Sequence, residues 1–142
     1  MGATGATGAT GAMSAMGAMS TIAAVALGGA AGSLARHGVN IAVAHMVGRS
    51  VPYATAAVNL LGSAAIGVLA GLLASGRLTM APTMRAFVFV GILGGFTTFS
   101  SFMLDTLTLA QSGQASIAMS NVVAQTVVGF IAAYAGYYLA VS

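Results

Sequence analysis

The stretch Gly94-Gly95-Phe96-Thr97-Thr98-Phe99-Ser100-Ser101-Phe102 decides how this chain can fold. It lies entirely within an uncharged run, residues 86–104, which has about the length and apolarity that a membrane-spanning helix needs. Two adjacent glycines followed by two β-branched threonines are unfavourable in an uninterrupted helix. Unwound backbone is tolerated at membrane depth only where it is buried in protein or lines a cavity. The sequence therefore predicts a helix break and, at the break, a site.

Composition places the chain in a membrane. Of its 142 residues, 58% are apolar and only 4% are charged, whereas a soluble domain carries about 25% charged residues. The four arginines are scattered singly, so they form no basic patch and we expect no nucleic-acid partner. The chain has no cysteine and a single carboxylate. It therefore lacks a thiolate nucleophile and the pair of acids used in hydrolysis, and we expect no enzymatic activity.

The chain divides into a tail and a membrane domain. Residues 1–20 repeat Gly-Ala-Thr three times and otherwise hold only Gly, Ala, Ser and Met, so we predict a disordered low-complexity tail. Residues 21–142 are predicted to form an all-α integral membrane domain of four transmembrane helices. We expect these helices at about 21–47, 54–74, 86–109 and 115–140, with the third broken in the middle of the membrane.

The arginines give no preferred orientation. With four spans, Arg77 and Arg85 lie on one side of the membrane, and Arg36 and Arg49 lie on or towards the other. Positive charges normally concentrate in cytoplasmic loops, and here the two sides carry equal numbers. The tie predicts a dual-topology chain that inserts both ways and pairs as an antiparallel dimer, with a two-fold axis in the membrane plane.

Side chains around the predicted break suit a small anion. Phe99 and Phe102 are three positions apart, so they project to nearly the same helix face. An aromatic ring has a positive edge, and the hydroxyls of Ser100 and Ser101 are hydrogen-bond donors. Together these groups can replace part of the water around an anion. The alternative is that the phenylalanines face lipid or core while the hydroxyls bond to their own helix.

The same nine residues strongly resemble the signature Gly-Gly-x-Thr-Thr-Phe-Ser-Thr-Phe of the Fluc (CrcB-type) fluoride ion channel family. Residues 28–36 resemble the glycine-rich first helix of that family, which ends in arginine, and residues 58–63 resemble its Val-Asn-x-x-Gly-Ser second helix. Asp105 stands where the family usually has glutamate. The fourth helix is less regular, because Asn121 and Gln125 stand where tyrosine and serine are expected.

The resemblance implies a role for each matching residue. Phe99 and Phe102 would meet dehydrated fluoride with their ring edges. The other side chains implied to line the fluoride pathway are Asn59, Ser100, Ser101, Asp105, Asn121 and Gln125. Arg36 would attract anions at an aqueous vestibule. The backbone carbonyls of Gly94 and Thr97 would hold a structural Na⁺ at the dimer interface.

The function that the resemblance implies is a passive, fluoride-selective channel. It would act as an antiparallel homodimer in membrane lipid, as a multi-pass protein of a bacterial plasma membrane, and would export F⁻ to relieve toxicity. The alternative is a small dual-topology multidrug or cation transporter with four helices. Such a transporter needs an acid in its first helix, whereas residues 21–47 contain only Arg36 as a charged side chain. Asp105 has two further interpretations, a structural ion pair with Arg36 and a proton-coupling acid.

Overall fold

The computed structural model of the chain describes residues 4–48 and 52–142, and all regular secondary structure within those ranges is helical. The first half contains α1 (Thr4–Val47) and α2 (Tyr53–Ala74). The third span is built from four consecutive pieces, α3 (Pro82–Arg85), the π-helical segment η1 (Ala86–Leu93), α4 (Gly94–Phe96) and α5 (Phe99–Gln111). The last span consists of α6 (Ala115–Val123), the π-helical segment η2 (Ala124–Val128) and α7 (Gly129–Val141).

Among the described residues, four helical stretches are long and apolar enough to cross a membrane. They cover Met16–Val47, Tyr53–Ala74, Pro82–Gln111 and Ala115–Val141. The prediction of an all-α chain with four spans is confirmed. The third span begins four residues earlier than the expected residue 86, because Pro82 occupies the first turn of α3, where its missing N–H costs nothing.

The first helix begins at Thr4, although we expected a disordered tail over residues 1–20. The residues of α1 from Met16 to Ser20 are exposed, so alanine's intrinsic helix propensity, and not packing, accounts for helix in this part.

At its other end α1 stops at Gly48, whose φ of 81° is a backbone conformation that glycine adopts without strain. The division into an independent tail and a membrane domain stays a prediction. Arg49, used in the orientation argument, lies outside the described residues.

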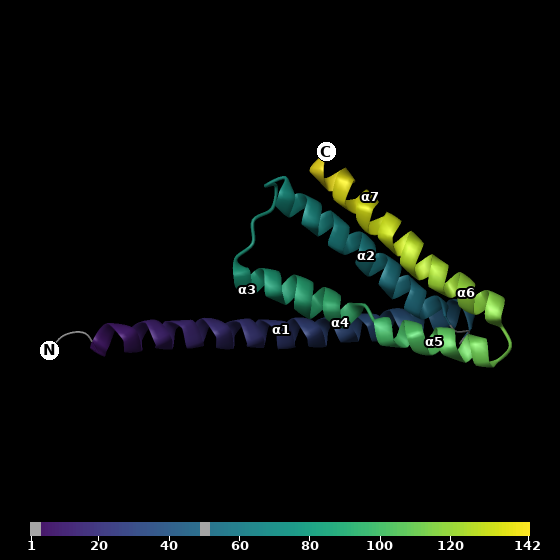
Figure 1. The fold of residues 1–142 in the computed structure, drawn as a ribbon, viewed down its shortest axis with the longest axis horizontal. Coiled ribbons are helices and arrows are strands. Elements are labelled where there is room, and N and C mark those ends of the chain that lie inside the picture. Colours follow the sequence, from purple (N-terminus) through teal and green to yellow (C-terminus); the bar gives the residue numbers. More distant parts are fainter. Residues whose placement is uncertain (1–3, 49–51) are drawn as a thin grey trace.

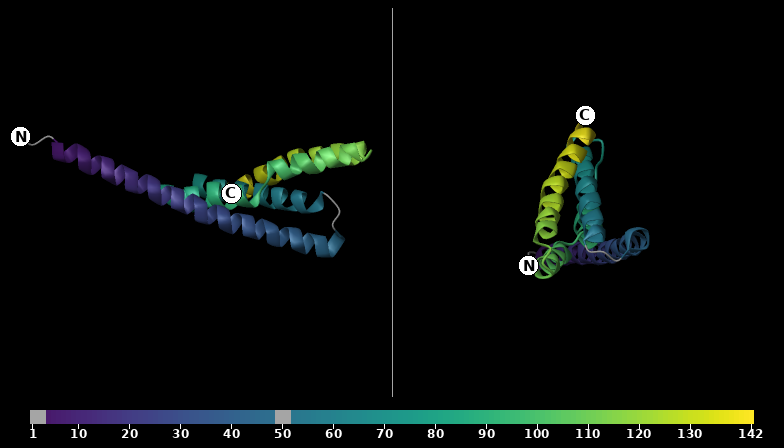
Figure 2. Two further views of the ribbon diagram at one scale, coloured as in Figure 1. Left: turned by 90° about the horizontal axis from the view of Figure 1, so that it is seen from below. Right: turned by 90° about the vertical axis from the view of Figure 1, so that its right-hand side faces the viewer.

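The helices pack as two pairs that cross each other. In one pair α1 lies against η1 and α4, and in the other α2 lies against α7. Figure 1 shows the α2–α7 pair running obliquely to α1. The left-hand view of Figure 2 shows that α5 diverges from α1 beyond the break. The right-hand view of Figure 2 shows α2 and α7 rising together from the layer that contains α1 and α5.

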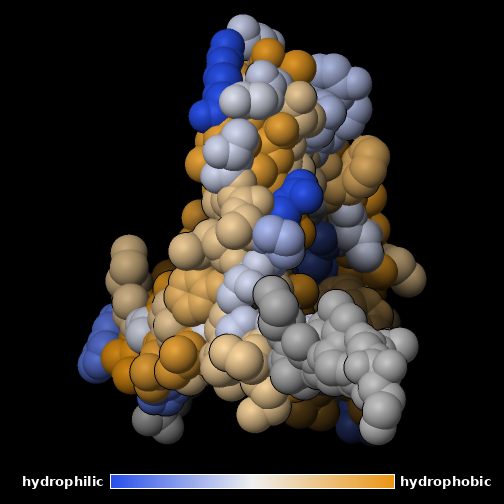
Figure 3. All heavy atoms as spheres, turned by 90° about the vertical axis from the view of Figure 1, so that its left-hand side faces the viewer, coloured by the Kyte–Doolittle hydropathy of each residue, from blue (hydrophilic) through white to orange (hydrophobic). Residues whose placement is uncertain are grey.

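Glycines allow both pairs to approach closely. A Cβ added to Gly32 in α1 would collide with the backbone of Ile92, and one added to Gly67 in α2 would collide with the backbone of Ala133 in α7. Small residues at four-residue spacing allow this kind of backbone contact in lipid, where burial of apolar surface gives no driving force. Most apolar side chains stay on the outside, and the side view in Figure 3 is mainly hydrophobic, with a few hydrophilic groups.

Two side chains from the α2–α3 connection form hydrogen bonds with the C-terminal end of the last span. The guanidinium of Arg77 donates to the carbonyl oxygen of Ala140 at 3.3 Å, and the hydroxyl of Ser75 donates to the same oxygen at 3.4 Å. The carbonyls of the last helical turn have no helical partners and carry partial negative charge. Arg77 therefore stabilises the C-terminal end of α7 and fixes it beside the end of α2.

Candidate functional site: a polar pocket at the helix break

The third span is interrupted at two threonines. Thr97 and Thr98 have extended backbone, with ψ of 162° at Thr97 and φ of −154° at Thr98. The helix restarts at Phe99, where the Thr98 hydroxyl accepts a hydrogen bond from the Ser101 N–H at 3.2 Å. This is an N-cap, in which a threonine oxygen satisfies one of the unpaired donors of a first helical turn. The predicted break is confirmed, and the capping threonine explains where it ends. Its position in the middle of a membrane stays a prediction.

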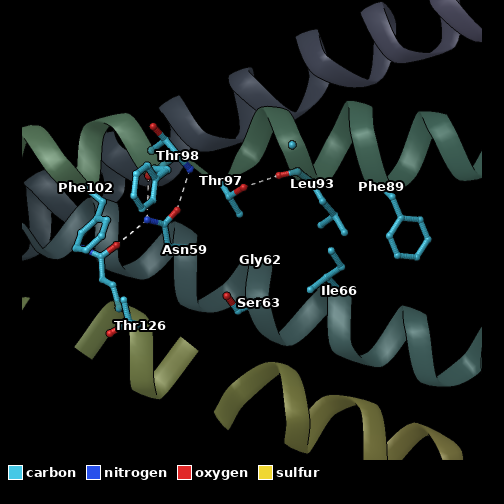
Figure 4. Close-up of a pocket in the computed structure, with 13 residues that line it drawn as sticks. Asn59, Gly62, Ser63, Ile66, Phe89, Leu93, Thr97, Thr98, Phe102 and Thr126 are labelled. Atoms are coloured by element: carbon cyan, nitrogen blue, oxygen red, sulfur yellow. Dashed lines mark hydrogen bonds between the residues drawn. The ribbon is translucent and has the colours of Figure 1, made fainter. Parts of the chain in front are cut away.

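The side chain of Asn59 pairs with the extended backbone. Its Oδ1 accepts from the Thr98 N–H at 2.8 Å, and its Nδ2 donates to the Thr98 carbonyl oxygen at 3.0 Å. Figure 4 shows Asn59 reaching from α2 to Thr98 across the pocket. The amide thus replaces the pairing that the backbone loses when the helix unwinds. Unpaired backbone groups cost several kcal/mol in a membrane, so Asn59 stabilises the break.

Two backbone carbonyls lose their helical partners at the break. In a continuous helix the Gly94 carbonyl would accept from the Thr98 N–H, which instead donates to Asn59. The Thr97 carbonyl would accept from the Ser101 N–H, which instead donates to the Thr98 hydroxyl. The Thr97 oxygen does accept a long bond from the Arg36 guanidinium, at 3.4 Å. Carbonyl oxygens freed in this way are the ligand type that a hard cation such as Na⁺ uses in broken helices.

A row of hydrogen-bonded amide side chains links Asn59 on α2 to the last span. Asn59 Nδ2 donates to Gln125 Oε1 at 2.6 Å, and Gln125 Nε2 donates to Asn121 Oδ1 at 2.8 Å. Asn121 Nδ2 then donates to the hydroxyl oxygen of Thr106 on α5 at 2.9 Å. Asn121 lies in α6 and Gln125 lies in the π-helical segment η2, and both side chains are buried. Short π-helical segments are frequent at functional sites. The structure therefore brings Asn59 of α2 together with Asn121 and Gln125 of the last span. The role of these residues in an ion pathway stays a prediction.

The two phenylalanines of the signature differ in exposure. Their rings meet edge to face, with centroids 5.6 Å apart and an angle of 66° between the planes. Phe102 is 3% exposed, whereas Phe99 is 72% exposed. One ring is therefore held in the protein, and the other projects from the described chain.

A pocket of about 360 Å³ joins these groups. It opens between α2, the broken span and the η2 segment of the last span, and its apolar lining includes Ile66, Phe89 and Leu93 (Figure 4). The polar or aromatic residues that line it are Asn59, Ser63, Thr97, Thr98, Phe99, Phe102, Gln125 and Thr126. An apolar pocket with a few convergent polar groups is typical of a binding site for a small species.

The remaining predicted residues lie around the pocket. The Ser101 hydroxyl accepts from the Thr98 hydroxyl at 3.0 Å, whereas Ser100 is exposed on the next position of α5. Asp105 is half-buried and has no hydrogen-bond or ion-pair partner among residues 4–48 and 52–142. Arg36 bonds to Thr97 at the level of the break and not to Asp105. Within the part of the chain that the structure describes, no group of three or more His, Cys, Asp and Glu side chains forms a metal site.

Sequence reasoning placed Thr98 at the break without assigning its roles, and it missed Thr106. Thr98 caps α5 and pairs with Asn59, and Thr106 ends the row of amides that begins at Asn59. Thr98 carries a sequence signal, because threonine before Phe-Ser-Ser is a favourable N-cap. Thr106 carries no comparable signal, since a hydroxyl within a helix normally bonds to its own backbone.

Replacement of Asn59 by leucine is expected to lower the free energy of unfolding by at least about 2 kcal/mol, because the N–H and C=O of Thr98 are left unpaired. Thermal unfolding of the purified protein in detergent measures the change. The matched control is Ser63→Ala, since Ser63 lines the same pocket from α2 but makes no hydrogen bond among the described residues. Equal melting temperatures for Asn59→Leu and Ser63→Ala would show that the amide does not stabilise the break.

Comparison with known proteins now identifies the family. Residues 23–137 match the family described as CrcB-like protein, Camphor Resistance (CrcB). The chain belongs to the CrcB family. A relative from Opitutus terrae is 45% identical over 117 residues, which cover 82% of this chain and 89% of the relative. A relative from Magnetococcus marinus is 46% identical over 111 residues, covering 78% and 89%, and one from Rhodospirillum centenum is 45% identical over 114 residues, covering 80% and 90%.

These three CrcB relatives are each named fluoride-specific ion channel FluC. The family is one of ion channels and not of enzymes, in agreement with the composition. With four membrane-spanning helices and bacterial relatives of this kind, the chain is a multi-pass protein of the cell membrane. The family match begins at residue 23, so residues 1–20 lie outside it.

Proposed function

We propose that this chain is a passive, fluoride-selective channel that exports F⁻ from the cytoplasm. The observation that carries the proposal is the pocket at the helix break, where Phe99, Phe102 and hydrogen-bond donors converge in a chain of the CrcB family. The names of the relatives, which are fluoride-specific ion channels, support the identity of the ion.

The geometry suits an ion that sheds most of its water. Fluoride is small and strongly hydrated, so a pathway must replace water with fixed donors. Ring edges of Phe99 and Phe102 carry partial positive charge, and the buried amides of Asn121 and Gln125 add N–H donors. A narrow path lined in this way accepts fluoride and is too tight for chloride, because pore diameter and the donors that line it set selectivity.

A second copy of the chain is expected to complete the pathway as an antiparallel homodimer. Phe99 projects outward from the described chain, and the pocket beside it is open on one side. The tie in arginine count supports insertion in both orientations. A two-fold axis in the membrane plane then brings two broken spans against each other, and the exposed Phe99 becomes buried between the protomers.

The dimer centre is the proposed place for a structural Na⁺. The carbonyls of Gly94 and Thr97 are freed from helical hydrogen bonding, and Gly94 is exposed while Thr97 is half-buried. Bound there, the ion would neutralise partial negative charge where two breaks meet. The bond from Arg36 to the Thr97 oxygen is long, at 3.4 Å, and leaves room on that oxygen for a second contact.

Polar groups beyond the phenylalanines complete the proposed route. Ser100, Ser101 and Asp105 follow one another along α5, and Ser101 is tied to Thr98 by its hydroxyl. Arg36 carries positive charge at the level of the break and would draw anions toward it from a vestibule.

The alternative, a small multidrug or cation transporter, is not favoured. Such a transporter needs a membrane-embedded acid for proton exchange, and the chain's single carboxylate, Asp105, lies on α5 and not in the first span. The relatives named above are ion channels.

The test is ion release from liposomes that hold the purified protein, with a potassium ionophore to balance charge. A fluoride electrode is expected to record rapid F⁻ release, and a chloride electrode is expected to record none above protein-free liposomes. Absence of F⁻ release from folded, dimeric protein would overturn the channel function. Proton-driven uptake of an organic cation, lost in Asp105→Asn, would then support the transporter.

Removal of Na⁺ is expected to weaken the proposed dimer. In a buffer that contains N-methylglucamine in place of Na⁺, the carbonyls of Gly94 and Thr97 lose their cation and F⁻ release falls. Size-exclusion chromatography and the fluoride electrode measure the two effects, and readdition of Na⁺ is expected to restore both. Full F⁻ release and an intact dimer after exhaustive exchange would contradict the Na⁺ site.

A further inference from the structure

Methionine is the only side chain larger than threonine in residues 1–20. Met13, Met16 and Met19 follow one another at three-residue spacing among glycine, alanine and serine. Figure 1 shows α1 continuing past the start of α3 toward the N-terminus, and the family match begins only at residue 23. Neither the packing of the spans nor the family match therefore accounts for these thioethers.

Met16 and Met19 lie on an open part of α1. Their side chains are 72% and 70% exposed, and no other part of the described chain lies within 4 Å of a Cβ added to Gly17. Methionine normally fills irregular gaps in a core, and here there is no gap to fill. Residues three apart on a helix are neighbours, and the methionine side chain has several rotatable bonds. Both sulfur atoms can therefore reach one ion.

The beginning of the third span brings two further methionines to the same end of the molecule. The hydroxyl oxygens of Thr21 on α1 and Thr83 on α3 lie 3.5 Å apart, so the start of α3 is fixed beside α1. Met84 directly follows Thr83 and is 50% exposed, and Met80 precedes α3 and is half-buried. Met19 comes shortly before Thr21, at a separation of about 3 Å along the helix axis. Thioethers from two elements thus gather where α1 leaves the other spans.

The chemistry at this end of the molecule favours a soft cation. A thioether is a neutral, polarizable ligand, and it selects Cu(I) over the hard cations that prefer oxygen. The only carboxylate side chain, Asp105, lies on α5, and the residue that follows Met84 is the exposed Arg85. Opposite charge on a side chain therefore does not hold a cation here, and its bonds to sulfur have to supply the affinity.

We propose that Met16 and Met19, together with Met80 and Met84, form a binding site for a soft monovalent cation of the Cu(I) and Ag(I) class. None of these residues lines the pocket at the helix break, so the site is independent of the proposed channel function. A thioether has no proton to lose, so the affinity is expected to be the same at about pH 6 and about pH 8, whereas binding to histidine would weaken at the lower pH.

The experiment is a titration of the full-length, untagged protein in detergent with silver nitrate, in a chloride-free sodium nitrate buffer. Isothermal titration calorimetry measures the affinity, and NMR of isotope-labelled methionine methyl groups shows which side chains contact Ag⁺. We expect the methyl resonances of Met16, Met19 and Met84 to shift. Replacement of both Met16 and Met19 by leucine is expected to weaken binding at least about tenfold, because loss even of an outer-shell partner of a metal costs that much. Leucine keeps the apolar volume and the helix propensity, so the variant is expected to fold as wild type does.

The double replacement Met46→Leu and Met119→Leu is the matched control. Met46 is 82% exposed at the other end of α1, and Met119 is 63% exposed on α6, which Figure 1 shows far from the start of α3. We expect this protein to bind Ag⁺ as tightly as wild type. Absence of Ag⁺ binding by wild type, equal weakening in the two double variants, or an affinity that falls markedly at the lower pH would overturn the site. Unchanged binding in the Met16→Leu and Met19→Leu protein would place Ag⁺ elsewhere and would overturn it as well.

Discussion

Fluoride release is expected to fall by about a hundredfold or more when Phe99 is replaced by isoleucine, which corresponds to roughly 3 kcal/mol of added barrier. Isoleucine is apolar and bulky but has no aromatic ring edge to meet a dehydrated anion. Phe99 is 72% exposed in the described chain, so its replacement removes little packing within the protomer. The fluoride electrode measures the rate in liposomes, and size-exclusion chromatography checks that the variant is folded.

Phe130→Ile is the matched control for this prediction. Phe130 is 70% exposed, almost the same as Phe99, but it lies on α7 beside Tyr134 and does not line the pocket. We expect its variant to release F⁻ at the wild-type rate. Similar losses in the two variants would mean that the rings act on the fold or on lipid contact, and that Phe99 has no special place in the pathway.

Replacement of Gly32 by alanine is expected to lower the free energy of unfolding by about 3 kcal/mol, the upper end for overpacking. The added Cβ would collide with the carbonyl oxygen of Ile92 and would approach the N–H nitrogen of Phe96 to 2.9 Å. These neighbours are backbone atoms immediately before the break, so they cannot rotate away as a side chain can. F⁻ release is expected to fall as well, because α1 supports the segment that leads into Thr97.

Gly38→Ala provides the comparison on the same helix. Gly38 has nothing within 4 Å of an added Cβ, so alanine is expected to match wild type or to stabilise α1 by about 0.5–1 kcal/mol. Thermal unfolding in detergent measures both variants. If Gly32→Ala were as stable as Gly38→Ala, close packing of α1 on the broken span would not be what holds the two together.

The break was predictable from local chemistry, and its pairing was not. Adjacent glycines and β-branched threonines disfavour helix wherever they occur, so the sequence alone indicates the interruption at Thr97 and Thr98. The partner of Thr98 is 39 positions away, and only the three-dimensional packing of α2 against the break brings Asn59 to it. The resemblance to channels indicated that Asn59 belongs to the pathway, without indicating what its two N–H groups contact.

The first and last spans contain two other features that could not be predicted from the sequence. The repeat at residues 4–20 has no apolar face to pack, which argued for disorder, but its alanines have the highest helix propensity and continue α1 without packing. The widened turns of η1 and η2 depend on how neighbouring helices meet, so nothing in the local sequence marks Gln125 as lying in one. Thr106 was missed for the same reason, because its role exists only once α5 and α6 lie side by side.

The pairing of Asn59 with Thr98 has a consequence for biogenesis. A newly inserted subunit has to satisfy the backbone of its interrupted span before lipid surrounds it, and here both groups of Thr98 are satisfied within one polypeptide. The interrupted span therefore needs no second copy to satisfy the backbone of Thr98. In the proposed antiparallel dimer, assembly would join two subunits that are already folded, and its rate would depend on how often subunits of the two orientations meet.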